Sequence, residues 1–446
     1  TIDATNGAIN VYADKGTINF NGAIINTGAS SLAFMKGGGA VNFNSPTTAK
    51  IDTNGTVFYI PPTISPVPTS PSYSPFLGLT AAALTGFNNL NNLTLNMAAN
   101  SNLAVASYVQ TKVSDLANSS IGALGATVTG TNYNDYLLYK SELTADAGTT
   151  YAQFKKIALS NSSIINNANL STADNNVVLM AQENNEANKD WVKLTNNGTI
   201  SLTGKGSLAM YASNGKITNS ANSNITVGDS GTAIYGKNKG VGDTSIENKG
   251  TINLADDDGI AISYEPNLTS TIVVENKGQI TSTAKKGTGI YAAKDTNSIQ
   301  YSALNSGNIS LGEGGVGLYT NATSTITSPK LSNTGTIKVG KNGIGLYGYE
   351  ETTTGNVTVG DSGIALYSQG GDVNIGSSTT NPTIKVGDTN ATAVYTTGSG
   401  QTVTSTKASY DIGTGSYGFV NVNSGTGNTI NISGGTATLK DKGLFI

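Results

Sequence analysis

The chain has 446 residues, of which 55 are Gly, 28 are Asp or Glu and 25 are Lys, while His, Cys and Arg are absent. Without His or Cys the chain has no Ser-His-Asp or Cys-His catalytic group, no disulfide and no thiolate metal site. The net charge of −3 and the lack of Arg give no sign of a nucleic-acid partner.

The chain nevertheless has the composition of an ordered protein, because aliphatic residues are frequent and regularly spaced. No apolar run reaches the roughly 18 residues that a transmembrane helix needs. The first residues already have the pattern of strand and turn, and the last ones, LKDKGLFI, stop within a motif. We therefore expect a fragment of a longer protein.

Residues 1–60 have the pattern of a few β-helix coils. The segments GAINVYADKGTINFNGAII at 7–25 and GAVNFN at 39–44 place Gly and Asn before short aliphatic strands. Residues 61–78 form a proline-rich stretch, since seven of the ten prolines lie between Pro46 and Pro75. This stretch is expected to be an extended, polyproline-like link.

Residues 79–160 change character and become rich in Ala and Leu, with apolar residues at helical spacing. Candidate helices are 103–116, 133–143 and 150–159. We expect an α-helical subdomain here, inserted in the solenoid and packed on its side or end. The main β-helix is then expected at 161–446.

A repeat dominates the region from 161 to 446. The motif Gly-x-small-aliphatic-Tyr starts near residues 231, 259, 287, 315, 343, 363 and 391, so most steps are 28 residues and one is 20. A second motif, Asn-x-Gly-x-Ile, interleaves with it at Gly250, Gly278, Gly307 and Gly335. Short strands in units of this length, without a helical period, predict an all-β, right-handed parallel β-helix of about 28 residues per coil.

The side-chain directions in the Tyr motif follow from the period of two in a strand. The fourth position is always aliphatic and is expected inside. The third position, always small, and the fifth, usually Tyr, are then expected outside, which gives a tyrosine ladder beside a shallow stripe. The ladder could stack sugar rings or accept a flat protein partner, or it could only stabilise the coils. Its residues are Tyr235, Tyr291, Tyr319, Tyr347, Tyr367 and Tyr395.

A column of mostly charged residues precedes the Tyr motif. Stacked like charges repel, so the two Lys among the acids favour a self-neutralising, solvated edge. A row of cation sites is the alternative, although nothing resembles a known calcium loop, and no metal or cofactor is expected. The column comprises Asp229, Asp257, Lys285, Glu313, Lys341, Asp361 and Thr389.

Four segments carry a resemblance to a known family: NKGTINL at 248–254, NTGTIKVG at 333–340, KNGIGLYG at 341–348 and VGDSGIALY at 359–367. They resemble the passenger regions of large type V autotransporter adhesins, especially fusobacterial ones. The resemblance covers 163–446 well and 1–60 loosely. It implies a rod exposed on the outer membrane of a bacterium, where family members mediate coaggregation and attachment to host cells as virulence factors. In that family a C-terminal β-barrel, expected here outside this fragment, anchors the chain.

The resulting expectation is a cell-surface adhesin without catalysis. Its partners would be a host-cell protein receptor, a glycan, or the surface of a partner bacterium. Segment 79–160 and the irregular loops are expected to recognise the partner, with Tyr108, Tyr136 and Tyr139 as candidate binding residues. Two alternatives remain open: a passive spacer that presents a binding tip elsewhere, and a polysaccharide-degrading β-helix enzyme that uses carboxylates.

Overall fold

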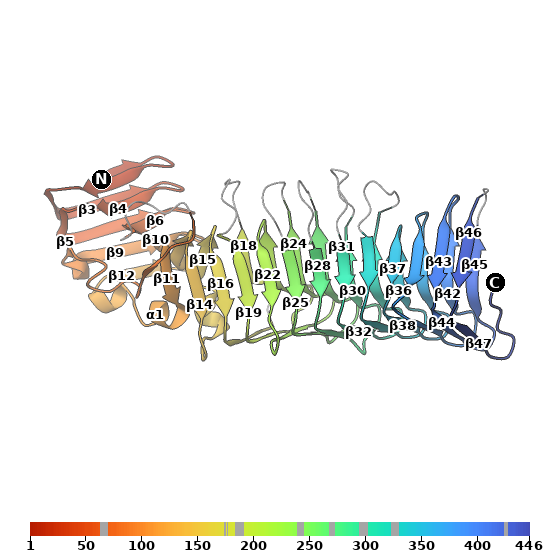
Figure 1. The fold of residues 1–446 in the computed structure, drawn as a ribbon. Helices are drawn as coiled ribbons and strands as arrows, with labels where there is room; N and C mark the ends of the chain where they lie inside the picture. The colour runs from red at the N-terminus through yellow and green to blue at the C-terminus, as the bar shows by residue number, and fades with distance from the viewer. Residues whose placement is uncertain are drawn as a thin grey trace. The chain divides into compact units, whose positions relative to one another are not determined.

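The computed structural model describes residues 1–62, 70–173, 175, 177–182, 191–238, 245–266, 273–293, 302–322, 330–422 and 427–446. The chain divides into two units, each built of short parallel strands (Figure 1). Unit 1 comprises Thr1–Ala168, Ala181–Asn184 and Asp190–Val192. Unit 2 comprises Asn169–Met180, Asn185–Lys189 and Lys193–Ile446. Strand β18 (Val177–Gln182) spans the sequence boundary between the two units.

Unit 1 contains three parallel sheets. Sheet A has the order β1-β3-β5-β9-β12, with β8 also paired to β5, and comprises β1 (Ile2–Ala4), β3 (Thr17–Thr27), β5 (Ala40–Ile51), β8 (Phe87–Asn88), β9 (Leu93–Met97) and β12 (Thr127–Gly130). Sheet B has the order β2-β4-β6-β10-β13-β15 and comprises β2 (Ile9–Ala13), β4 (Leu32–Lys36), β6 (Thr56–Ile60), β10 (Asn102–Ser107), β13 (Asn134–Tyr139) and β15 (Ile157–Ser160). The third comprises β7 (Ser74–Pro75), β11 (Val109–Lys112), β14 (Glu142–Ala145) and β16 (Ser163–Asn166).

The interior of unit 1 is an aromatic core between sheets A and B. Phe34 lies 5.3 Å from Phe43 and 5.7 Å from Phe58, measured between ring centroids, and all three are 0% exposed. Such rings bring large buried areas and favourable edge and stacked contacts. The strand pattern expected for 1–60 is therefore confirmed.

The helical subdomain expected at 79–160 is wrong. The candidate helices at 103–116 and 133–143 are mainly the strands β10, β11, β13 and β14, and the one at 150–159 is divided between a short helix and β15. The helices in this region are α1 (Val113–Ala117), α2 (Tyr151–Phe154) and the 3₁₀ turns Leu90–Asn92 and Gly122–Leu124.

The error has a physical cause. Helix propensities of Ala and Leu differ from those of strand formers by less than about 1 kcal/mol per residue, and tertiary pairing outweighs them. Strand β10 pairs on one side with β6 and on the other with β13, so coils on both sides bond its backbone. An apolar run this short fits a buried strand as well as a helix. The segment is part of the solenoid and not an excursion from it.

The proline-rich link at 61–78 lies partly outside the described residues, since 63–69 are not described. In its described part, β7 (Ser74–Pro75) pairs with β11 and ends its sheet. A proline is tolerated at such an edge because its missing N–H removes no hydrogen bond from the sheet.

Unit 2 is a parallel β-solenoid in which each full coil gives one strand to each of three sheets (Figure 1). Within unit 2, sheet C comprises β19 (Lys193–Asn196), β22 (Lys216–Asn219), β25 (Ser245–Asn248), β28 (Val273–Asn276), β31 (Ser302–Asn305), β34 (Lys330–Asn333), β37 (Glu351–Thr353), β40 (Val373–Gly376), β43 (Thr402–Thr406) and β46 (Thr429–Ser433). Sheet D comprises β17 (Asn169–Thr172), β20 (Thr199–Leu202), β23 (Asn224–Val227), β26 (Thr251–Leu254), β29 (Gln279–Thr281), β32 (Asn308–Leu311), β35 (Thr336–Val339), β38 (Asn356–Val359), β41 (Thr383–Val386), β44 (Ser409–Ile412) and β47 (Thr436–Leu439). Sheet E includes β21 (Leu208–Ser213), β24 (Thr232–Lys237), β27 (Ile260–Glu265), β30 (Thr288–Ala292), β33 (Val316–Thr320), β36 (Ile344–Gly348), β39 (Ile364–Ser368), β42 (Thr392–Thr397) and β45 (Tyr417–Val422).

The register of sheet E confirms the coil length expected from the repeat. Thr288 pairs with Val316, 28 residues later, and Ile344 pairs with Ile364, 20 residues later. The short step is therefore a full coil with a trimmed connection. The aliphatic residues of the Tyr motif fill the interior as expected, since Ile234, Leu318 and Val394 are at most 1% exposed. Full burial of such a side chain contributes roughly 1.5–3 kcal/mol.

The small residues of the Tyr motif lie inside, not outside as expected. Ala233 is 0% exposed and is skipped in the strand pairing, where Thr232 pairs with Leu208 and Ile234 with Met210. A Cβ on Gly317 would come within 2.7 Å of Ile337 and 2.5 Å of a carbonyl oxygen in the next coil. The strand is irregular here, so the third and fourth residues of the motif both face the core. Strict alternation of side chains along a strand had predicted that only the fourth faces inward.

A ladder of buried asparagines runs through sheet C. In the first five members, the amide Nδ2 donates to the Oδ1 of the asparagine in the next coil, at 2.7 or 2.8 Å. The last member, Asn333, donates to the Thr353 hydroxyl at 3.1 Å. All are 0% exposed: Asn196, Asn219, Asn248, Asn276, Asn305 and Asn333. The ladder fixes the register of the coils, because a shift would leave buried amides unpaired.

Candidate functional site

The outer face of sheet E carries a column of stacked tyrosines, as expected from the sequence. The centroid distances are 5.4 Å for Tyr291–Tyr319, 5.2 Å for Tyr319–Tyr347, 4.7 Å for Tyr347–Tyr367 and 5.0 Å for Tyr367–Tyr395. The interplanar angles of these pairs lie between 24° and 45°. The rings are half-buried, so each leaves part of its surface to solvent. We call this set the tyrosine column.

The column begins one coil earlier than the sequence motif suggested. Tyr211 stacks on Tyr235 with centroids 5.4 Å apart. The sequence motif did not include Tyr211, because Ser207 stands at the position that Gly occupies in most copies of the motif. Burial raises the pKa of Tyr291 and Tyr347, and the neighbouring phenols raise it further. Tyr291 and Tyr347 are therefore neutral at physiological pH.

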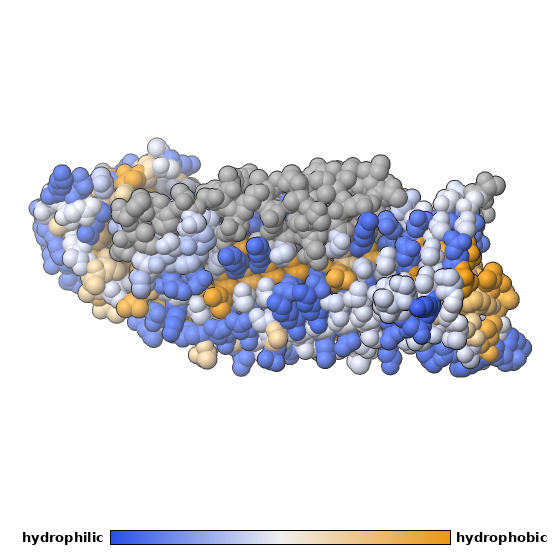
Figure 2. Space-filling model, viewed as in Figure 1, coloured by the Kyte–Doolittle hydropathy of each residue, from blue (hydrophilic) through white to orange (hydrophobic). Residues whose placement is uncertain are grey.

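A second column flanks the tyrosines and is largely aliphatic. It occupies the second position of the motif, where side chains are half-buried: Thr232, Ile260, Thr288, Val316, Ile344 and Ile364. Figure 2 shows a band of hydrophobic residues along unit 2, bordered by hydrophilic ones. Aromatic faces beside aliphatic groups suit ligands or partners with apolar faces.

The tyrosine column is interrupted at Ser263. This residue pairs with Tyr235 in the coil before and with Tyr291 in the coil after, so it occupies a tyrosine position. The tyrosine of this coil is Tyr264, one residue later, which is 0% exposed and points inward between Gly236 and Ala292. This coil has the sequence GIAISY at 259–264, so its tyrosine stands one residue later than in the other copies of the motif.

Charged groups border this interruption. The Lys237 Nζ lies 2.6 Å from the Glu265 Oε2, and the two side chains are 41% and 45% exposed. The Tyr235 hydroxyl also donates to Glu265. Burial and this hydrogen bond raise the pKa of Tyr235, while the bond from Lys237 lowers the pKa of Glu265. Glu265 is thus a carboxylate near neutral pH, held beside the open tyrosine position.

The three candidate tyrosines from segment 79–160 are placed in unit 1. Tyr136 is 1% exposed, and its hydroxyl accepts from the Leu79 N–H at 3.0 Å and lies 2.7 Å from the Ser119 hydroxyl. A side chain so enclosed cannot reach a partner surface, so it is corrected to a core residue. The strand period of β13 explains this, since Tyr136 and Leu138 both face inward.

Tyr108 and Tyr139 belong to an aromatic cluster around a lysine. Tyr108 lies 5.7 Å from Trp191 and 6.5 Å from Tyr139 between centroids. The Lys140 Nζ lies 5.4 Å from the Tyr139 centroid and 5.9 Å from that of Trp191. Tyr108 is 9% exposed, while Tyr139 is half-buried. The Lys140 ammonium thus lies within cation–π distance of the Tyr139 and Trp191 rings.

Unit 1 also contains a cavity of about 350 Å³ beside α1. Apolar side chains including Leu103, Leu116 and Ile121 line it, together with Asp135 and Lys156. The Lys156 Nζ and the Asp135 Oδ1 are 3.9 Å apart, and burial raises the pKa of Asp135 against the opposing effect of Lys156. The two opposite charges lie within ion-pair distance and partly offset each other, so the cavity has both apolar and polar walls.

The column of charged turn residues is a neutralised edge. Lys285 forms an ion pair with Glu313 at 3.2 Å, and Lys205 with Asp229 at 3.0 Å. Asp257 accepts the backbone N–H of Lys285 at 2.7 Å, so some carboxylates bond the next coil directly. Within the described ranges, no group of three or more acidic side chains could hold a metal ion.

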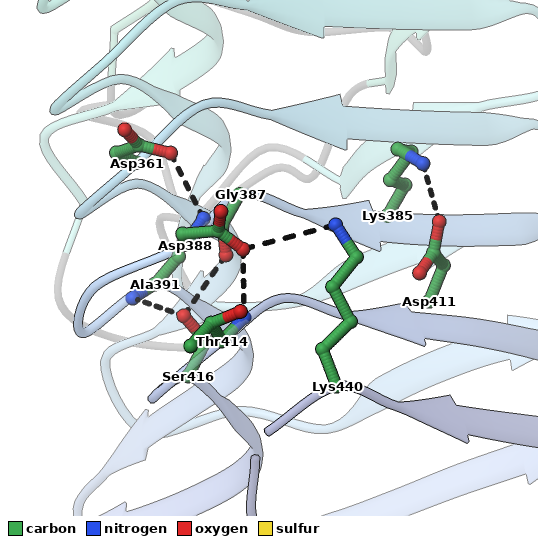
Figure 3. Close-up of polar contacts among 9 residues, drawn as sticks. All are labelled: Asp361, Lys385, Gly387, Asp388, Ala391, Asp411, Thr414, Ser416 and Lys440. Atoms are coloured by element: carbon green, nitrogen blue, oxygen red, sulfur yellow. Dashed lines mark hydrogen bonds and ion pairs between the residues drawn. The ribbon is translucent and has the colours of Figure 1, made fainter. Parts of the chain in front are cut away.

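One member of this column is corrected by the register. Val359 pairs with Val386, so Asp361 is matched by Asp388 and not by Thr389. Figure 3 shows that Asp361 accepts the Asp388 N–H at 2.8 Å and that Asp388 accepts the Thr414 N–H at 2.7 Å. The Lys440 ammonium lies 3.8 Å from Asp388. This coil has an extra residue in its turn, where both Thr389 and Asn390 have positive φ.

No protein-family model, curated protein or solved structure matches the chain. Among the helices in the described part of the chain, none is long and apolar enough to span a membrane. Function therefore has to be argued from the surfaces themselves.

Proposed function

We propose that this chain is part of a bacterial cell-surface adhesin, the passenger of a type V autotransporter, and that it binds without catalysis. The observation that carries the proposal is the tyrosine column, which presents half-buried aromatic rings on successive coils of unit 2, with one interruption at Ser263. Tyr is enriched in recognition surfaces because its ring is apolar and its hydroxyl forms hydrogen bonds. The partner would be a glycan or protein receptor on a host cell or on another bacterium.

The stacked coils suit this role. Parallel pairing between coils satisfies the backbone over the whole length of a solenoid, and no disulfide is needed in a chain without Cys. Stability then depends on aliphatic columns and the asparagine ladder, which leaves the outer positions free to vary. Of the residues expected to bind, we propose Tyr235, Tyr291, Tyr319, Tyr347, Tyr367 and Tyr395, with Tyr139 as a secondary candidate.

A passive spacer is the second candidate function. It is favoured by the stacking itself, since each ring of the column already packs on its neighbours and could serve only to stabilise the coils. An adhesin predicts saturable binding, whereas a spacer predicts none. A polysaccharide-degrading enzyme would release new reducing ends.

The test uses the purified 446-residue chain on host epithelial cells, on partner bacteria and on a glycan array, with reducing ends assayed in parallel. We expect saturable binding that falls at least tenfold when Tyr319 and Tyr347 are both changed to Ser. Thr226→Ser, on the outer face of sheet D, is the control. Deleting 79–160 is not a suitable test, because this segment supplies strands to all three sheets of unit 1. Absence of binding to all three surfaces would favour the spacer.

A further inference from the structure

We propose that the interruption of the tyrosine column at Ser263 is a binding site for a single pyranose ring of a carbohydrate. This inference deepens the proposed adhesin function, because it assigns one site and one ligand class within the column. The site has Ser263 as its floor, Tyr235 and Tyr291 as its two walls, and the ion pair of Lys237 and Glu265 at its rim.

The spacing of the coils leaves room for one ring. Adjacent parallel strands lie about 4.8 Å apart, so the backbones that carry Tyr235 and Tyr291 are separated by about 9.6 Å. A guest ring midway between them would take the place of the missing tyrosine. Its distance to each wall would be about 4.8 Å, within the 4.7 to 5.4 Å that the column's own rings adopt.

Elsewhere in the column this space is filled. Each consecutive pair from Tyr291 to Tyr395 is in contact, so no ring can enter without displacing a tyrosine. At the interruption, Tyr264 has turned into the core and leaves only a half-buried serine outside. The coil at 259–266 therefore differs from its neighbours in carrying a half-buried serine where they carry a tyrosine ring.

The chemistry around the position selects a sugar over an aromatic side chain. A pyranose has C–H faces that stack on aromatic rings and hydroxyls around its edge. Its edge would meet the Ser263 hydroxyl, the Glu265 carboxylate and the Lys237 ammonium, which accept and donate hydrogen bonds. An aromatic side chain of a protein would place apolar C–H groups against the same charges, which disfavours burial there.

The decisive variant is Ser263→Tyr, which completes the column and closes the site. The probes are methyl β-D-galactopyranoside, methyl β-D-glucopyranoside and their 2-acetamido counterparts, with p-cresol as the aromatic comparison. Saturation-transfer NMR on the full chain should show contact to ring-face protons of at least one pyranoside. We expect Ser263→Tyr to weaken this binding at least tenfold. The matched control is Ser310→Tyr, the same change at an exposed position of sheet D, which should leave it unchanged.

The midpoint of thermal unfolding shows whether each variant is folded. For Ser263→Tyr this midpoint should equal or exceed that of the wild type, because the new ring gains two stacked neighbours. Glu265→Ala is the second variant: it keeps the opening but removes the carboxylate, and should weaken binding several-fold. The proposal is overturned if no pyranoside binds, if Ser263→Tyr binds as well as the wild type, or if p-cresol alone occupies the position.

Attachment to cells, measured on the same samples, separates this site from the adhesin proposal. Pyranoside binding without cell attachment would leave the site intact and contradict the adhesin. If Ser263→Tyr loses pyranoside binding but attaches to cells as the wild type does, both the pyranose site and the adhesin proposal stand. The surface that binds cells then lies elsewhere on the chain.

Discussion

The amide of Asn248 donates from Nδ2 to the Oδ1 of Asn276, 2.7 Å away in the next coil, and both side chains are 0% exposed. Asn276 in turn donates to Asn305 at 2.7 Å, so each amide is donor on one side and acceptor on the other. Nδ2 of Asn248 also lies 3.3 Å from the Gly250 carbonyl oxygen, which uses its second proton. Each buried asparagine thus binds its own turn and couples two coils.

The first prediction concerns the removal of one ladder member. Asn276→Ala leaves a donor of Asn248 and an acceptor of Asn305 unpaired inside the solenoid. Each such orphaned group costs about 1–3 kcal/mol, so we expect a loss of unfolding free energy of about 2–6 kcal/mol. Urea unfolding followed by circular dichroism measures the loss, and hydrogen exchange of the coils around Asn276 locates it.

The matched control is Asn308→Ala, the same substitution on the exposed face of sheet D. It should change stability by no more than about 0.5 kcal/mol. If both variants lose the same stability, the ladder contributes nothing beyond ordinary strand packing, and the register must depend on the aliphatic columns alone.

The sequence motifs predicted the coil length and part of the outer surface. The spacing of a repeat gives the number of residues per coil, and a residue that recurs at one motif position must form a stacked column. Tyr347 and Tyr367 recur at one place in the motif, and the structure stacks them 4.7 Å apart. The asparagine ladder was not predicted, although Asn248 begins the motif Asn-x-Gly-x-Ile. Asn before Gly is also typical of turns, and a single sequence does not distinguish a solvated turn from a buried amide.

The failure in unit 1 has another origin. Segment 79–160 lacks a repeat, so only local composition was available, and Ala and Leu favour a helix. Strand β10 forms because β6 and β13 lie on either side of it, a relationship between segments far apart in the sequence. The missing tyrosine at Ser263 could have been predicted, since the serine stands where seven other coils have tyrosine.

The second prediction concerns the glycine of the Asn-x-Gly motif. A Cβ on Gly307 would lie 2.2 Å from the Gly278 carbonyl oxygen, and one on Gly335 would lie 2.1 Å from that of Gly307. None of these glycines has positive φ, so close approach of neighbouring coils, and not backbone conformation, requires glycine here. Gly307→Ala should destabilise the chain by about 1–3 kcal/mol through overpacking.

Gly16→Ala provides the comparison, because a Cβ there would meet nothing within 4 Å and its φ is not positive. Its unfolding midpoint should match that of the wild type or rise slightly, since Ala restricts the unfolded chain. A Gly307→Ala variant as stable as Gly16→Ala would show that the coils can separate without penalty.

The third prediction tests how much the tyrosine column stabilises unit 2. Tyr319 contacts Tyr291 at 5.4 Å and Tyr347 at 5.2 Å, so Tyr319→Ala removes two ring pairs. Each pair contributes about 0.5–1.5 kcal/mol beyond area burial, which predicts a loss of at least about 1–3 kcal/mol. Tyr319→Phe keeps both rings and should retain most of the stability. Equal losses in the two variants would assign the effect to the hydroxyl instead.

The fourth prediction concerns a carboxyl group in the interior. Glu351 is 0% exposed and stands in an aliphatic column of sheet C, paired with Leu331 before it and Val373 after it. Burial raises the pKa of Glu351 well above its usual range, the Ser368 hydroxyl and the Gly348 backbone oppose the rise, and the neighbouring Glu350 adds to it. Glu350 itself lies 3.8 Å from Lys330. The folded state therefore holds the Glu351 proton more tightly than the unfolded state.

The sign of the pH dependence follows from this linkage. Below the unfolded pKa of about 4.3, the carboxyl is protonated in both states and its contribution to stability is fully present. As the pH rises from there toward the raised folded pKa, the unfolded state ionises first and this stability is lost.

Glu351→Leu continues the aliphatic column, so its gain in unfolding midpoint over the wild type should be larger at pH 8 than at pH 4.5. Thr352→Leu is the control: it puts the same side chain on the outer side of β37 without removing a carboxyl, and should lack this growing difference. A Glu351→Leu gain that is constant with pH would mean that the buried carboxyl does not change its proton affinity on folding.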